Sequence, residues 1–323
     1  MRIITFEIDR FDGSRSWTQS YQFEPAPGMT ILSALILIKE KQDPTLNFTA
    51  SCRSAICGAC AVRVNGNAAL ACDTKLDDAL ARWKAATLRL SPLGNFTVIS
   101  DLVVDWSDKI ERLREAKPGL KARREFTAET GCRQTPAQFA RIQQQWDCIL
   151  CGACASECNK LSDDSADFLD PFIYTHANRY AQDSRSAEPL THVRPMEAHG
   201  LWKCLHCMEC VTKCPKEIEP AADIAAMRAM AIVHGDKRDP GSRHALAFST
   251  DIENTGRLNE VRLVPRTEGL WKAATGRMMF TLRMIRRGKL SMGEAAKLYF
   301  ADNAPVDGID GVRKIIRFRR DAR

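Results

Sequence analysis

The sequence predicts an α+β protein in which a small N-terminal sheet domain is followed by an all-α domain and a helical C-terminal extension. Alternation of apolar and polar side chains indicates strands near the N-terminus, and three- and four-residue apolar spacing indicates helices after residue 100. Twelve of the 13 cysteines also form three groups of four, one in the sheet domain and two in the helical domain.

The N-terminal domain is expected to span residues 1–100. Residues 1–9 and 17–24 alternate between two faces around the turn residues Asp12-Gly13, which predicts a β-hairpin. Helical spacing over residues 29–41 predicts a helix. Three returning strands are expected at Ala61–Val64, Ala69–Cys72 and Thr87–Leu90. This order of hairpin, helix, cysteine loop and strands is that of a β-grasp ferredoxin domain.

Residues 101–235 are expected to form the all-α domain, and residues 236–323 the extension. Helices are predicted at Asp101–Leu113, Pro136–Gln145 and Pro220–Val233, and one after each cysteine loop. The extension should contain helices near 268–287 and 291–300.

The net charge of +7 is concentrated in the extension, where 19 Lys/Arg face 11 Asp/Glu. The extension has no aromatic-interleaved or zinc-finger pattern, which disfavours nucleic-acid binding. The longest apolar run, Met29 to Ile38, is too short to span a membrane. With no signal-peptide pattern at Met1, we expect a cytoplasmic protein that lies on the inner face of the cell membrane through its partners. Export together with a signal-bearing partner is the alternative.

The first cysteine group has the spacing C-x4-C-x2-C-x11-C and consists of Cys52, Cys57, Cys60 and Cys72. This spacing is typical of a plant-type [2Fe–2S] site. A zinc site with four thiolate ligands is the alternative, but such sites usually pair two C-x2-C knuckles.

The other two groups share the spacing C-x2-C-x2-C-x3-C, which is that of two-cluster ferredoxins. In this motif the fourth cysteine binds the other cluster. One [4Fe–4S] cluster is therefore expected on Cys148, Cys151, Cys154 and Cys214, and the next on Cys158, Cys204, Cys207 and Cys210. Cys207 decides whether this second cluster has four irons or is a [3Fe–4S] cluster. Zinc is again the alternative.

Two further residues have open roles. Cys132 lies outside the three groups and is expected to be a small buried filler, with a redox role as the alternative. His206 could tune a cluster potential through a hydrogen bond, or be incidental to its loop.

Several segments in order resemble the iron–sulfur subunit of the succinate dehydrogenase/fumarate reductase family, over residues 1 to about 230. They are Cys52-Arg53, Cys57-Gly58-Ala59-Cys60, Asn65-Gly66, Leu70-Ala71-Cys72, Ile99-Ser100-Asp101-Leu102-Val103-Val104-Asp105, Arg179-Tyr180-Ala181-Gln182-Asp183-Ser184-Arg185 and Cys214-Pro215-Lys216-Glu217-Ile218-Glu219-Pro220. The resemblance implies a FAD flavoprotein partner that interconverts succinate and fumarate. It also implies electron transfer from flavin through [2Fe–2S] and the two [4Fe–4S] clusters to a further subunit, with no catalytic residue in this chain.

The chain departs from the family pattern around the last cluster. Most members have a non-cysteine at the position of Cys207, and a Pro, a Trp and a polar residue, commonly His, at positions that contribute to a quinone site. Here those positions are Asn159, Asp163 and Leu205. In the first loop, Ala55 replaces a common glycine.

The extension resembles the C-terminal part of heterodisulfide reductase C subunits, at Gly256-Arg257-Leu258-Asn259-Glu260 and nearby residues. Such subunits pass electrons to a cysteine-rich CCG-domain partner, as do variant fumarate reductases. We therefore expect a CCG-domain subunit linked to quinone or thiol, with the extension as its docking segment. The segment from Met278 to Arg287 could instead lie on an anionic membrane or pack as an ordinary helix. Another flavoprotein dehydrogenase or a free ferredoxin-like carrier are the alternative functions.

Overall fold

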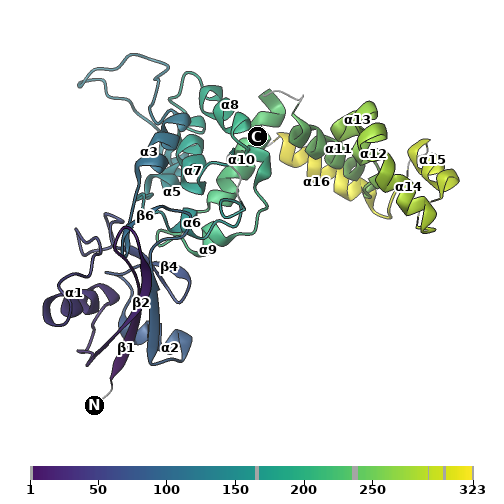
Figure 1. The fold of residues 1–323 in the computed structure, drawn as a ribbon. Coiled ribbons are helices and arrows are strands. Elements are labelled where there is room, and N and C mark those ends of the chain that lie inside the picture. Colours follow the sequence, from purple (N-terminus) through teal and green to yellow (C-terminus); the bar gives the residue numbers. More distant parts are fainter. Residues whose placement is uncertain (1–2, 164–166, 235–238, 290, 301–302, 322–323) are drawn as a thin grey trace. The chain divides into compact units, whose positions relative to one another are not determined.

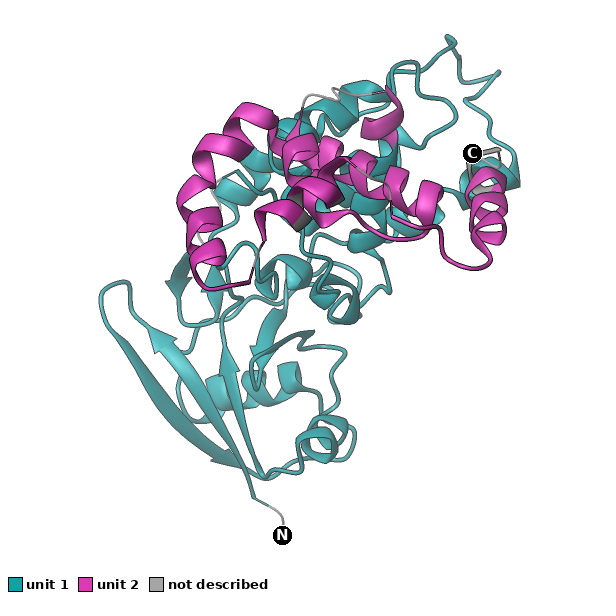
Figure 2. Cartoon of the chain, turned by 90° about the vertical axis from the view of Figure 1, so that its right-hand side faces the viewer, with its two compact units in different colours: residues 1–229 teal, residues 230–323 magenta. Residues whose placement is uncertain are grey.

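The computed structural model describes residues 3–163, 167–234, 239–289, 291–300 and 303–321. The chain divides into two compact units, residues 1–229 and residues 230–323 (Figure 2). The expected boundary between residues 235 and 236 lies outside the described residues.

A five-stranded mixed sheet forms the N-terminal part of the first unit, in the order β2-β1-β5-β3-β4 (Figure 1). Its strands are β1 (Ile4–Phe11), β2 (Ser16–Phe23), β3 (Ala61–Val64), β4 (Asn67–Leu70) and β5 (Thr87–Ser91). β1 and β2 form the predicted antiparallel hairpin, and β5 lies parallel to β1. The predicted strand Ala69–Cys72 begins two residues earlier, because Asn65 and Gly66, at φ 47° and 77°, make a tight turn directly after β3.

The core of this domain lies between the sheet and α1 (Ile31–Lys41). Ile4, Phe6 and Ile8 point inward from β1 with no exposed surface, as their alternation predicts. The Thr30 hydroxyl caps α1 by accepting a hydrogen bond from the Ser33 amide, and the Ser33 hydroxyl accepts one from the Thr30 amide. A second helix, α2 (Leu76–Trp83), buries Leu76, Ala79 and Leu80.

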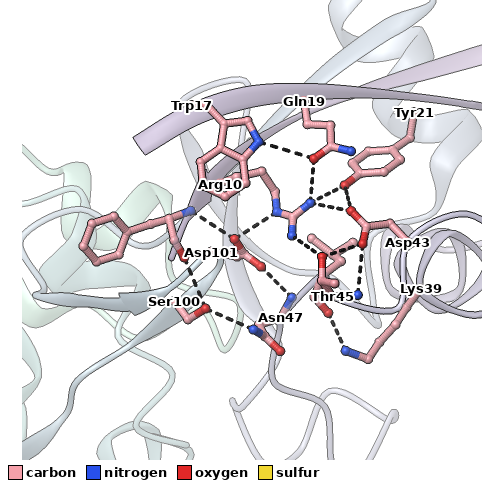
Figure 3. A network of polar contacts seen from close by, with 12 residues as sticks. Arg10, Trp17, Gln19, Tyr21, Lys39, Asp43, Thr45, Asn47, Ser100 and Asp101 are labelled. Carbon is pink, nitrogen blue, oxygen red and sulfur yellow. Dashed lines mark hydrogen bonds and ion pairs between the residues drawn. The ribbon is translucent and has the colours of Figure 1, made fainter. Parts of the chain in front are cut away.

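Arg10 continues the buried face of β1, where an apolar side chain would be expected (Figure 3). Its Nε donates to Asp101 at 2.9 Å, and its Nη1 lies 2.6 Å from Asp43 Oδ2. Gln19, Tyr21 and Thr45 also accept hydrogen bonds from this guanidinium. The Arg10 network therefore ties β1 and β2 to the segment before the first cysteine loop and to the end of the domain.

The junction after the sheet differs from the sequence prediction. A two-stranded sheet of β6 (Val98–Ser100) and β7 (Val103–Val104) forms here, and β7 lies at the start of the predicted helix Asp101–Leu113. The helix α3 begins only at Ser107 and ends at Leu113. Asp101 is buried at φ 48°, and its carboxylate accepts hydrogen bonds from the Phe11 and Asn47 amides. These tertiary bonds override the local helical pattern.

The rest of the first unit is helical, as predicted. Its helices are α4 (Pro136–Ala140), α5 (Gln143–Trp146), α6 (Ala153–Ser156), α7 (Pro171–Ala181), α8 (Leu190–Ala198) and α9 (Glu209–Thr212), with 3₁₀ turns at Arg114–Ala116 and Leu201–Lys203. The helix α10 (Pro220–His234) begins in the first unit and ends in the second. The predicted helix Pro136–Gln145 is interrupted at Ile142, whose φ of −124° is not helical. The helix α10 matches its predicted range to within one residue.

The second unit is built from helices alone in the residues that are described. They are α11 (Pro240–Thr255), α12 (Glu260–Glu268), α13 (Leu270–Gly276), α14 (Met278–Arg286), α15 (Met292–Phe300) and α16 (Ile309–Asp321). The predicted helix 268–287 is divided at Arg277, whose φ of −111° separates α13 from α14. The predicted α+β class is thus confirmed.

Candidate metal centres

The first cysteine loop surrounds its sulfur atoms with backbone amides. Cys52 Sγ accepts hydrogen bonds from the amides of Ser54, Ile56 and Cys57 at 3.3–3.4 Å. The Ser54 amide is the main cause that lowers the pKa of Cys52 to about 6. Such amides stabilise a thiolate, and they also stabilise the negative charge of a reduced iron–sulfur cluster.

The same loop orients the remaining three sulfurs of the group. The amides of Cys52, Ala55 and Cys72 donate to the sulfurs of Cys57, Cys72 and Cys60, respectively. Ala55 adopts φ 56°, so the position where the family commonly has glycine keeps a left-handed backbone despite its Cβ atom. Burial raises the pKa of Cys60 to about 12, so a positively charged metal centre would be needed to hold it as a thiolate.

The two later cysteine groups line two pockets in the predicted combinations. One pocket is lined by Cys148, Cys151, Cys154 and Cys214. The other is lined by Cys158, Cys204, Cys207 and Cys210. In each pocket three sulfurs come from one loop and the fourth from the end of the other.

The two loops also share their backbone conformation. Leu150 and His206, each two residues after the first cysteine of its loop, have φ 51° and 52°. Gly152 and Met208, two residues further on, have φ 79° and 66°. Each loop then enters a short helix, α6 or α9, that carries its third cysteine. The repeated left-handed turns bend each loop around its pocket.

The surroundings of the loop from Cys148 differ from those of the loop from Cys204. A Cβ atom added to Gly58 of the first cysteine group would lie 2.8 Å from Cys151 Cα, so the two loops are in close contact. A Cβ atom on Gly152 would lie 2.8 Å from the Phe96 ring. In the other loop, Leu205 is 72% exposed, Met208 is 44% exposed, and Cys207 is exposed.

Burial of the pocket cysteines disfavours free thiolates. It raises the pKa of Cys151 to about 11 and that of Cys210 to about 12, and it also raises the pKa of Cys154. Thiolates in such places need the positive charge of bound metal. Among the described residues no three His, Cys, Asp or Glu side chains form a site for one metal ion. Each of the two later cysteine groups instead borders a pocket, as an iron–sulfur cluster requires.

Polar contacts join the sheet domain to the helical domain beside these pockets. Asn95 Nδ2 donates to the carbonyl oxygens of Ala155, Ser156 and Cys158, at 2.8, 3.2 and 3.1 Å. Arg63 Nε lies 2.9 Å from a carboxylate oxygen of Glu157. The end of the first C-x2-C-x2-C-x3-C motif, from α6 to Cys158, is therefore held from the sheet side at several points.

The structure also places the remaining predicted residues. Cys132 is half-buried rather than buried, and its carbonyl oxygen accepts a hydrogen bond from Arg185 at 3.3 Å. His206 is not isolated, because its Nε2 lies 2.8 Å from Arg228 Nη1. Asn159 and Leu205 line the second pocket, whereas Asp163 is exposed and pairs with Lys160. Arg228 was missed by the sequence reasoning.

A sheet domain with one cysteine loop, joined to a helical domain with two cross-paired loops, defines a multi-cluster iron–sulfur electron-transfer protein. Residues 5–111 match the model of the 2Fe-2S iron-sulfur cluster binding domain, and residues 144–218 match the model of the 4Fe-4S dicluster domain.

The chain is 54% identical over 290 residues to the 8-methylmenaquinol:fumarate reductase iron-sulfur subunit of Wolinella succinogenes, covering 88% of this chain and 90% of that protein. It is 37% identical over 240 residues to the fumarate reductase iron-sulfur subunit of Mycobacterium tuberculosis, covering 73% and 95%. The chain therefore belongs to the succinate dehydrogenase/fumarate reductase iron–sulfur subunit family, whose members are parts of oxidoreductase complexes.

A solved structure agrees with the fold. A chain of the Mycobacterium smegmatis Sdh1 complex in the apo form aligns with a TM-score of 0.63 at 21% identity, covering 72% of this chain and 98% of that chain. This likeness supports the arrangement of a sheet domain followed by a helical domain.

Proposed function

We propose that this chain carries electrons between a FAD-containing flavoprotein subunit, which interconverts succinate and fumarate, and a CCG-domain subunit linked to quinone or thiol. The observation that carries the proposal is the pair of pockets, each lined by four cysteines from both loops. Exposed side chains, Leu205 and Met208, lie beside the second pocket. The family membership supports the flavoprotein partner.

In this proposal the chain holds one [2Fe–2S] cluster and two [4Fe–4S] clusters, which supply one-electron transfer. Cys52, Cys57, Cys60 and Cys72 hold the first; Cys148, Cys151, Cys154 and Cys214 the second; and Cys158, Cys204, Cys207 and Cys210 the third. The residues of the chain fix each cluster in place and tune it through amide hydrogen bonds and burial.

The surroundings of the second pocket support a protein acceptor. Cys207 provides a fourth sulfur there, and Asn159 and Leu205 line the pocket where most family members have quinone-binding residues. Leu205 and Met208 are exposed beside it. Exposed apolar side chains next to a redox site suit contact with a partner protein, since interfaces are enriched in such residues at their centre. The name of the Wolinella succinogenes relative is that of a methylmenaquinol-linked enzyme.

The C-terminal extension supplies a second surface for that partner. Trp271 is 80% exposed, and Met278, Met279, Phe280 and Leu282 are also exposed on α13 and α14. Between Glu268 and Glu294 every charged residue is Lys or Arg. Aromatic, Met and Arg side chains are typical of protein interfaces, so we assign this surface to an acidic face of the CCG-domain subunit.

No helix in the described part of the chain combines the length and apolar character needed to cross a bilayer. We infer a peripheral location on the inner face of the membrane, reached through partners. Binding of the isolated complex to anionic vesicles in the absence of the CCG-domain subunit would instead assign the extension to lipid.

The test is EPR spectroscopy of Cys207→Ser, with the anaerobically purified wild-type complex as reference. We expect wild-type protein to lack a strong [3Fe–4S] signal, and the variant to gain one while the other two clusters keep their spectra. Cys132→Ser is the matched control, and it should change no cluster. A strong [3Fe–4S] signal in fresh wild-type protein, or an unchanged spectrum in Cys207→Ser, would contradict the assignment.

The partners are tested separately by purifying the complex under native conditions. We expect a flavoprotein that oxidises succinate or reduces fumarate and a cysteine-rich subunit to remain bound. A stable holo monomer without either subunit would favour a free carrier, and a flavoprotein inactive with both acids would favour another dehydrogenase.

A further inference from the structure

Both C-x2-C-x2-C-x3-C loops are preceded by a tryptophan two residues before the first cysteine. Trp146 precedes Cys148, and Trp202 precedes Cys204. An arginine lies over each ring: Arg179 Cζ is 4.4 Å from the centre of Trp146, and Arg228 Cζ is 5.3 Å from the centre of Trp202. A cation–π contact of this kind limits where the guanidinium can move. The repeat therefore includes a held positive charge beside each loop.

Arg228 differs from Arg179 in that it also binds its cysteine loop. Its Nε donates to the carbonyl oxygen of Leu201 at 2.9 Å, and its Nη2 donates to that of Cys204 at 2.9 Å. Its Nη1 lies 2.8 Å from His206 Nε2. The planar guanidinium thus contacts the loop at its start, at its first ligand and at its left-handed turn.

Among the residues that the structure describes, no carboxylate pairs with the charge of Arg228. In the described part of the chain its hydrogen-bond partners are two carbonyl oxygens and a histidine ring, and none of them is a carboxylate. By contrast, Arg185 is bound by both oxygens of Asp183. An unpaired cation in a partly buried place acts over several ångströms with little screening.

We propose that Arg228 is a positioning residue of the second [4Fe–4S] site and that its fixed charge raises the reduction potential of that cluster. When the cluster accepts one electron, its negative charge increases by one, and a nearby cation stabilises that state. This inference rests on the proposed assignment of a [4Fe–4S] cluster to Cys158, Cys204, Cys207 and Cys210.

The test is a redox titration of the intact complex, followed by EPR, for wild type, R228Q, R228K and R179Q. In R228Q we expect the reduced-to-oxidised ratio of the second [4Fe–4S] cluster to fall about tenfold at a fixed potential, which corresponds to about 59 mV for a one-electron couple. R228K keeps the charge and should recover most of this shift. R179Q is the matched control and should leave the second cluster unchanged.

An R228Q cluster with wild-type potential, or equal shifts in R228Q and R228K, would overturn the inference while leaving the proposed function intact. Absence of a second [4Fe–4S] signal in wild type would overturn the proposed function itself. If R228Q loses the second [4Fe–4S] cluster, the reduction potential of that cluster is measured in W202L instead. This variant keeps the arginine but removes its aromatic support, so we expect a smaller fall in potential, and an unchanged potential would refute the inference.

Discussion

The two C-x2-C-x2-C-x3-C loops have the same spacing and the same left-handed turns, yet they lie in different surroundings. The loop from Cys148 contacts the sheet domain at Gly58 and at the Phe96 ring. The loop from Cys204 exposes Leu205, Cys207 and Met208. The same backbone conformation is thus covered by the sheet domain in one copy and exposed in the other. The difference lies in what packs against each loop.

The largest expected effect on stability comes from removing the side chain of Arg10. Its contacts hold together the sheet domain, which covers the loop from Cys148. In Arg10→Met the buried Asp101 loses its cation, so the free energy of unfolding of this domain should fall by about 3–5 kcal/mol. Hydrogen exchange should rise in residues 148–154 and stay unchanged in residues 204–210.

The matched control for this variant is Arg89→Met, because Arg89 pairs with Asp9 on the exposed side of the same sheet. This surface pair should contribute less than about 1 kcal/mol. If hydrogen exchange changes equally in residues 148–154 and 204–210 after Arg10→Met, the loop from Cys148 does not depend on the sheet domain for its protection.

A smaller effect is expected from Gly58→Ala, which introduces a methyl group where Cys151 Cα would lie 2.8 Å away. Overpacking and the left-handed φ of 73° should together cost about 2–4 kcal/mol. The EPR spectra of both the [2Fe–2S] cluster and the first [4Fe–4S] cluster should change, while the second [4Fe–4S] cluster keeps its spectrum.

Gly131→Ala separates backbone strain from the clash. Gly131 has a left-handed φ of 59° but nothing within 4 Å of an added Cβ atom, so it reports the strain alone, about 1 kcal/mol. If Gly58→Ala costs no more than this control, the close contact between the two loops has no energetic importance.

The smallest effects come from a pair of equivalent positions, Ile149 and Leu205, each directly after the first cysteine of its loop. Ile149 packs against the core of the sheet domain, so Ile149→Ala should cost about 1–2 kcal/mol in thermal unfolding. Leu205 is 72% exposed, so Leu205→Ala should change stability by less than about 0.5 kcal/mol.

The functional expectation for this pair is the opposite of the stability expectation. Leu205→Ala should slow electron delivery to the proposed CCG-domain subunit, and Ile149→Ala should leave that rate unchanged. Rates measured in stopped-flow experiments with purified partner check this, and equal rates in both variants would contradict a docking role for the exposed loop.

Cysteine spacing was sufficient to predict which sulfurs line each of the two pockets in the helical domain. In this motif the first three cysteines line one pocket, and the fourth cysteine lines the pocket of the other motif. Local periodicity was likewise sufficient for β1, α1 and α10. These predictions depend on contacts within short stretches of chain, which a sequence displays directly.

Long-range polar contacts were not predictable in this way. Arg10 meets Asp101 across 91 positions, and that pairing also converts the start of a predicted helix into a tight junction. Arg228 meets His206 across 22 positions. The repeated Trp-x-Cys at both loops was a visible signal for a held cation, but it does not specify which arginine stacks on each ring.

The contact at Gly58 has a consequence for how fast electrons can move inside the molecule. Tunnelling between redox centres slows exponentially as their separation grows, so small fluctuations in distance become large fluctuations in rate. Because the backbone at Gly58 leaves no room for a methyl group against Cys151, the separation between these two centres is set by hard contact rather than by a flexible linker. Electron transfer between these two centres should therefore have a constant rate in every turnover. Variation in the overall rate should arise at the exposed Leu205 and Met208, where we propose that the partner binds.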